Sequence, residues 1–81
     1  MLFMSLLSPK GEGTDAIAYL KRLKAPAGIT IRDVYVTFGR YDGAVVFEAS
    51  TPKKAMSFVM DVGIKTGYLI ETLAAVPAKE M

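Results

Sequence analysis

The sequence contains no cysteine, no histidine and no tryptophan. Without cysteine the chain cannot form disulfides, and without cysteine and histidine it lacks the usual ligands of a structural zinc site. The same absences exclude cysteine nucleophiles and catalytic triads that depend on histidine. We therefore expect no metal site and no tightly bound cofactor.

Long apolar runs are also missing. No segment approaches the roughly 18 to 20 consecutive apolar residues that cross a bilayer. Residues 1–8 are apolar but lack a basic start and reach Pro9 and Lys10 too early for a signal peptide. These features predict a cytoplasmic protein without a membrane partner. Asn and Gln are absent too, which is a weak indication of a thermophilic source. The charged fraction of 22% does not support it, because heat adaptation usually enriches charged residues.

The charge balance is close to neutral. Ten Lys and Arg against eight Asp and Glu give a net charge of +2, too small to indicate a nucleic-acid partner without clustering. The one basic cluster, Lys21, Arg22 and Lys24, is explained by the end of a helix, where cations complement the helix dipole. We expect no binding of nucleic acid.

Apolar residues, by contrast, are abundant. The hydrophobic fraction is 52% and the mean hydropathy is +0.33. A domain of this size hides only about 60 to 65% of the surface of its unfolded chain. Part of the apolar surface is therefore expected to meet another subunit, which predicts a homo-oligomer.

Breaker residues and hydrophobic periodicity divide the chain into six elements. Thr14 or its neighbour can cap the first helix, Asp15 suits its positive end, and Thr51 with Pro52 is a strong start for the second. The predicted order is strand 2–8, a helix after Thr14 that Pro26 and Gly28 end, strand 29–38, turn 39–43, strand 44–49, helix 52–62, connection 63–67 and strand 68–76. This order predicts an α+β, ferredoxin-like βαββαβ domain over residues 1–76, with two helices on one face of a four-stranded antiparallel sheet and a frayed tail at 77–81.

The alternation of the two middle strands predicts a register. Placing Phe38 opposite Gly43 sets Val36 against Val45, Val34 against Phe47, Tyr35 against Val46 and Asp33 against Glu48. The sheet face that carries Tyr35, Ala44 and Val46 is then largely apolar, although helices cover only the other face. We expect a second copy of the chain to cover it in a two-fold dimer.

The central turn carries a recognisable pattern. The segment 38–49, with Gly39, Tyr41 and Asp42 in its turn, resembles the signature of the GYD-domain family, small bacterial and archaeal proteins named for a G-x-Y-D segment. Ser8 after the first strand and the segment 71–73 are similar to that family's first and last strands. The resemblance implies a ferredoxin-like fold related to dimeric α/β barrels.

Two groups of residues are candidates for ligand binding. In the turn, Arg40, Tyr41 and Asp42 could contact a ligand, although turn chemistry alone selects such residues. On the apolar face, Tyr35, Glu48 and Glu71, with Asp33, could frame a cavity, and two carboxylates there could share a raised pKa. Interfacial salt bridges with Arg32 or a lysine of the partner are the favoured alternative for these carboxylates.

The methionines of the second predicted helix also have two interpretations. Met56, Phe58 and Met60 could hold a flexible apolar ligand, but core packing or an oligomer contact is the better interpretation.

Two functions fit these residues. The first is a non-enzymatic dimer that binds a small molecule or a partner protein. The alternative is a cofactor-free enzyme of the dimeric α/β-barrel type, monooxygenase- or isomerase-like, in which Tyr35, Tyr41, Asp42 or Glu48 would transfer protons. The absence of histidine and cysteine favours the first.

Overall fold

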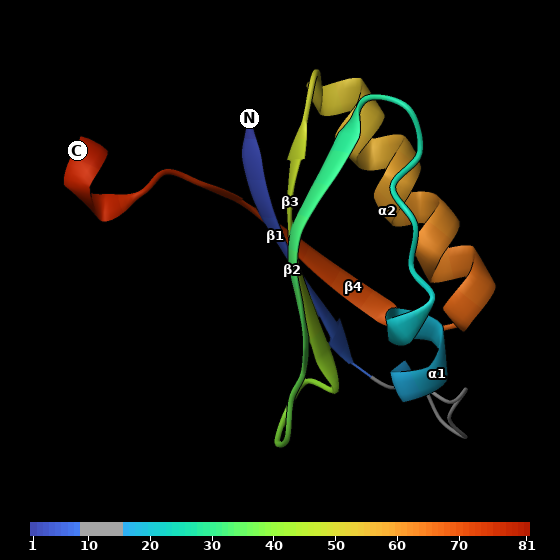
Figure 1. Ribbon diagram of the computed structural model, residues 1–81. Coiled ribbons are helices and arrows are strands. Elements are labelled where there is room, and N and C mark those ends of the chain that lie inside the picture. Colours follow the sequence, from blue (N-terminus) through green and yellow to red (C-terminus); the bar gives the residue numbers. More distant parts are fainter. Residues whose placement is uncertain (9–15) are drawn as a thin grey trace.

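The computed structural model describes residues 1–8 and 16–81 (Figure 1). The predicted cap at Thr14 and the acidic Asp15 lie outside these residues. The observed elements are β1 (Leu2–Ser8), α1 (Ala16–Lys21), β2 (Ile29–Val36), β3 (Gly43–Ala49), α2 (Pro52–Thr66), β4 (Leu69–Ala75) and a 3-10 helix (Ala78–Glu80) in the tail.

The four strands form one antiparallel sheet in the order β2-β3-β1-β4. Both helices lie on the same side of it, and the other side is bare (Figure 1). This arrangement confirms the predicted α+β class and is that of a ferredoxin-like fold.

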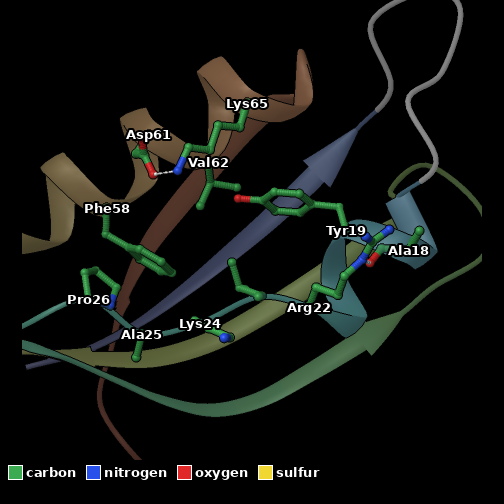
Figure 2. A pocket seen from close by; sticks show the side chains of 11 residues that line it. Ala18, Tyr19, Arg22, Lys24, Ala25, Pro26, Phe58, Asp61, Val62 and Lys65 are labelled. Carbon is green, nitrogen blue, oxygen red and sulfur yellow. Dashed lines mark hydrogen bonds and ion pairs between the residues drawn. The ribbon is translucent and has the colours of Figure 1, made fainter.

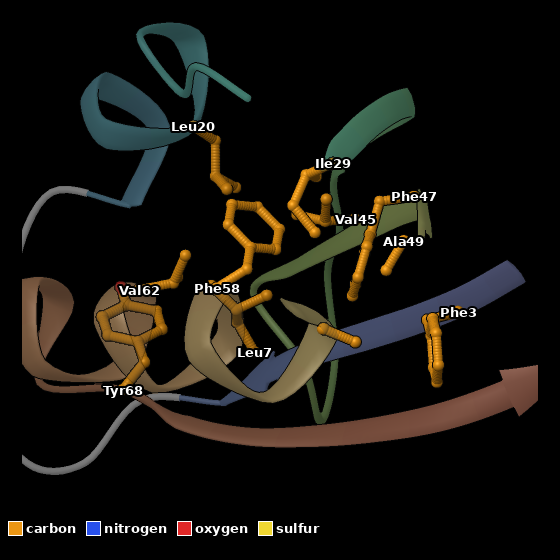
Figure 3. Packing of buried hydrophobic residues seen from close by; sticks show 11 residues of the cluster. Phe3, Leu7, Leu20, Ile29, Val45, Phe47, Ala49, Phe58, Val62 and Tyr68 are labelled. Carbon is orange, nitrogen blue, oxygen red and sulfur yellow. The ribbon is translucent and has the colours of Figure 1, made fainter. Parts of the chain in front are cut away.

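The core lies between the sheet and α2. In β1 and β3 every second residue is buried, because successive side chains of a strand point to opposite faces. The Phe47 ring is fully buried; it stacks on Phe3 at 5.5 Å between centroids and meets Phe58 of α2 edge-on at 5.0 Å (Figure 3). Such ring pairs stabilise a core beyond the area they bury.

The second helix begins as predicted. The Thr51 hydroxyl accepts the Lys54 backbone N–H at 3.1 Å, and Pro52 occupies the first helical position. The predicted end near Val62 was wrong by one turn, because the helix continues to Thr66 and closes at Gly67, whose φ is +70°. A glycine adopts this left-handed conformation without strain.

The second helix buries only some of the apolar residues for which core packing was considered. Its buried positions are Ala55, Phe58, Val62 and Thr66. Met56 and Met60 are 65% and 62% exposed, so the interpretation of these two methionines as core residues was wrong.

The first helix ends at Lys21, earlier than Pro26 implied. Two further turns continue the chain, since Arg22 N–H donates to the Tyr19 carbonyl and Leu23 N–H to the Leu20 carbonyl. Leu20 is nevertheless buried, at 4% exposure, and fixes this short helix to the core.

The hairpin register differs from the prediction. Val36 lies opposite Gly43, Tyr35 opposite Ala44 and Val34 opposite Val45, which is a shift of two residues that preserves the faces. Asp33 lies opposite Val46 in the same register, and a bulge between Ile31 and Asp33 then brings Thr30 opposite Glu48. The predicted pair of Asp33 with Glu48 was therefore wrong.

Candidate functional site

The bare face of the sheet is the first candidate site. The ladder pairs define its members, which we call the open face: Leu2, Met4, Leu6, Ser8, Thr30, Asp33, Tyr35, Ala44, Val46, Glu48, Leu69, Glu71, Leu73 and Ala75. Its centre, at Met4, Val46 and Leu73, is apolar, and these three side chains form one row across β1, β3 and β4. Polar groups lie mainly towards the ends and edges.

At one end of the open face, Glu48 is paired with Arg32. The Arg32 guanidinium donates to the Glu48 carboxylate, with both side chains part-exposed. The bulge after Ile31 brings Arg32 to this position. The expected ion pair thus forms within the chain and leaves Glu48 with a partner before any association.

At the opposite end, Tyr41 reaches across the sheet to β4. Its hydroxyl donates to Glu71 Oε2 at 2.7 Å, and the Arg40 guanidinium lies 5.6 Å from the centre of its ring. The hydrogen bond to Glu71, together with slight desolvation, raises the pKa of Tyr41. The raised pKa keeps the Tyr41 hydroxyl protonated at neutral pH, so it can donate a hydrogen bond or a proton but does not serve as a general base.

Asp42 holds the turn in place. Its backbone N–H donates to the Leu7 carbonyl at 2.7 Å, its carbonyl accepts the Thr37 N–H at 3.0 Å, and its carboxylate accepts the Tyr68 hydroxyl at 3.4 Å. Gly39, with φ of +115°, makes the sharp bend that precedes it. The positive φ expected of a turn glycine is found at Gly39, whereas the Asp42 carboxylate bonds the distant Tyr68 hydroxyl rather than local amides.

The candidate residues do not form a single cluster. Tyr35 and Glu71 lie at opposite edges of one row, Tyr35-Ala44-Leu6-Glu71, three strand spacings or roughly 14 Å apart. Glu48 lies four residues along β3 from that row, roughly 13 Å away. A shared proton between Glu48 and Glu71 is not possible at this separation, so the arrangement favours separate polar anchors around an apolar centre.

A second concave region lies on the other side of the sheet. A groove of about 750 Å³ runs between α1 with its following loop and α2, bordered by Tyr19, Arg22, Lys24, Phe58 and Lys65 among others (Figure 2). Burial raises the pKa of Tyr19, while the charge of Lys65 opposes that shift. Sequence reasoning missed this groove, and the only signal for it was the basic cluster at 21–24.

Other kinds of site receive no support from the described residues. Within residues 1–8 and 16–81, no three Asp or Glu side chains gather closely enough to hold a metal ion. No helix in this part of the chain combines the length and the apolar character that crossing a bilayer requires.

Comparison with protein families gives a match to this chain. A profile of the GYD domain family matches residues 6–81. The chain belongs to the GYD domain family. No curated protein and no solved structure is significantly similar to it. The segment 38–49, on which the sequence resemblance rested, contains the turn that carries Tyr41 and Asp42, followed by β3.

Proposed function

We propose that this GYD domain is a non-enzymatic binding protein that works as a homodimer, with the open faces of two copies packed against each other. The uncovered face of the sheet carries the proposal. Both helices lie on the other side of the sheet (Figure 1), and the open face has apolar side chains on all four strands. A second copy of the chain would cover this apolar area.

The exposure of these side chains supports a contact through the sheet. The open face has apolar side chains on all four strands, including Tyr35, Leu69 and Leu73 at 53%, 55% and 45% exposure. Contiguous apolar area of this kind marks interaction sites. Four strands of seven or eight residues give a projected area of roughly 450 Å². The sheet alone therefore supplies less than the roughly 800 Å² that one partner contributes to a standard interface.

The C-terminal arm, residues 76–81, supplies further contact area. It leaves the end of β4 on the side opposite the helices (Figure 1), where Val76 and Met81 are 59% and 94% exposed. A groove of about 600 Å³, bordered by Leu2, Glu48 and Pro77, lies beside the base of the arm. In the proposed dimer the arm of one copy packs against the edge of the other.

A substitution at the centre of the open face tests the dimer. Val46→Glu introduces a charge that a dry sheet contact cannot accommodate, so analytical ultracentrifugation at micromolar concentration should show a monomer where the unaltered chain is dimeric. Met60→Glu is the matched control, because it also replaces an apolar side chain with glutamate, at an exposed position on the helix side, and should leave the dimer intact. Removal of residues 77–81 should weaken the dimer without unfolding the sheet.

Circular dichroism of each variant separates loss of association from loss of folding. A monomeric unaltered chain, or a folded Val46→Glu variant that is still dimeric, would contradict the proposal.

A further inference from the structure

The groove between α1 and α2 has the chemistry of a ligand site independent of the open face. Its floor includes Leu23, Phe58 and Val62, and the Tyr19 ring forms part of its wall. Figure 2 shows the Tyr19 and Phe58 rings projecting from the two helices towards the same space. Apolar and aromatic linings with a few polar groups are typical of small-molecule sites, and about 750 Å³ falls within their usual volume range.

The Tyr19 hydroxyl is a polar group in this largely apolar groove. Tyr19 is half-buried and packs against the core, and its hydroxyl points towards Val62 and Lys65 of α2 (Figure 2). No hydrogen bond to this hydroxyl is found among the described residues. The group is therefore positioned to donate to, or accept from, a molecule that occupies the groove.

The charges of the groove are unbalanced. Three cations, Arg22, Lys24 and Lys65, line it with one carboxylate, Asp61, which gives a net charge of +2. Lys65 Nζ lies 3.0 Å from Asp61 Oδ2, so these two opposite charges neutralise each other. Arg22 and Lys24 are left without an anionic partner among the residues that line the groove.

Arg22 is also held in position. Its Nε donates to the Ala18 carbonyl at 3.2 Å, which orients the guanidinium at the end of α1 and leaves its terminal nitrogens available. A planar guanidinium suits carboxylate and phosphate oxygens, because it can donate two parallel hydrogen bonds.

We propose that this groove binds a small organic anion, with a carboxylate or phosphate head at Arg22 and Lys24 and an apolar, aromatic body against Tyr19, Leu23 and Phe58. The charge complementarity selects the head and the aromatic lining selects the body. The site lies on the helix side of the sheet and does not depend on the dimer.

Titration of the full-length ¹⁵N-labelled chain by NMR tests the site. The probes are 4-phenylbutyrate, phenyl phosphate and the neutral 4-phenylbutan-1-ol. At least one anion should bind saturably and more tightly than the alcohol, with the largest shifts in residues 18–26 and 58–65. Whichever anion binds more tightly identifies the preferred head group.

Single charge removals identify the cations that bind the head. Arg22→Gln and Lys24→Gln should each weaken the better anion by roughly three- to tenfold, the effect of losing one charge-assisted hydrogen bond at a part-exposed site. Lys79→Gln is the control, since it removes the same charge in the C-terminal arm and should leave the affinity unchanged.

Three results would overturn the site: equal affinity for the alcohol and both anions, shifts concentrated in the strands of the open face, or equal effects of the groove and control substitutions. The site would also be overturned if neither anion bound saturably up to about 10 mM, which corresponds to a binding free energy weaker than roughly −3 kcal/mol. Each readout is independent of the state of association, so failure here and failure of the dimer are distinguishable.

Discussion

Gly43, the first residue of β3, has a steric role that one substitution can expose. Its φ is not positive, so conformational freedom is not the reason for glycine here. A Cβ at this position would lie 2.6 Å from Leu20 Cδ1 and 3.3 Å from the Tyr35 carbonyl oxygen. Because Leu20 fixes α1 to the core, Gly43→Ala must displace the side chain that positions the wall of the groove.

The magnitude follows from two opposing effects. Forcing an extra methyl group into a packed core costs about 1 to 3 kcal/mol. Alanine in a strand is favoured over glycine by about 0.5 to 1 kcal/mol. The difference predicts a net loss of about 1 kcal/mol in the free energy of unfolding, and that loss lowers Tm by about 4 to 8 °C in a domain of this size.

Urea unfolding at a fixed protein concentration measures the effect, since association would otherwise change the apparent stability. Gly63→Ala is the matched control. A Cβ at Gly63 would meet nothing closer than Ile70 Cδ1 at 3.7 Å, and the position lies within α2, so this variant should be more stable by about 0.5 to 1 kcal/mol. The same chemical change is thus expected to have opposite signs at the two sites.

A second substitution locates the clash. Leu20→Val removes the Cδ1 atom, so Gly43→Ala should cost less in that background, with a coupling energy of about 1 kcal/mol. A Gly43→Ala variant as stable as the unaltered chain would refute the steric argument. A full cost retained in the Leu20→Val background would show that the Tyr35 carbonyl is the obstacle.

Two further predictions concern a cap and a titration. Thr51→Ala should lower the free energy of unfolding by about 1 kcal/mol, measured by urea unfolding, because the Lys54 N–H loses its acceptor. Thr51→Ser keeps the hydroxyl and should retain most of the stability. Glu71→Gln should lower the raised pKa of Tyr41 towards its ordinary value of about 10, as measured by NMR of ¹³C-labelled tyrosine. Since the neutral tyrosine is favoured in the folded protein, its contribution to stability is complete below pH 10 and is lost as the pH rises through the raised pKa. An unchanged titration of Tyr41 would show that the bond to Glu71 is not formed in solution.

Local signals in the sequence predicted the elements well. The alternation of β3 and the Thr51-Pro52 start of α2 depend on neighbouring residues, so they could be recognised without a structure. The end of α2 could not, because Gly63 suggested a break, whereas the buried Thr66 hydroxyl closes the last turn on the Val62 carbonyl at 2.7 Å. Tertiary burial overrode the local preference there.

The hairpin register was missed although its signal was present. Ile29 and Ile31 are both odd-numbered, whereas Val34 and Val36 are even-numbered, and all four face the helices. A strand can change phase in this way only where an extra residue is inserted, which is what a bulge does. The phase change at residues 31–34 therefore indicated the bulge that brings Arg32 to Glu48.

The partners within the candidate sites could not be inferred from spacing. Tyr41 and Glu71 are separated by 30 residues. They meet because the turn that carries Tyr41 is bonded to Leu7 at the end of β1, and β1 pairs with β4. The groove requires α1 and α2 to lie side by side, a relation that neither helix encodes alone. Strand order and helix packing are global properties, so these contacts appear only once the chain is folded.

The exposed apolar residues on α2 offer an alternative surface for the dimer contact. Met56, Met60 and Ile64 recur at intervals of four residues and are 65%, 62% and 81% exposed. They form a narrow stripe on one helix, and isolated apolar side chains on a surface are ordinary. The open face instead spans four strands and adjoins the arm, so it offers far more contiguous area. Met60→Glu and Val46→Glu therefore decide between the two surfaces: a dimer disrupted only by Met60→Glu would place the contact on α2, and our surface argument predicts the reverse.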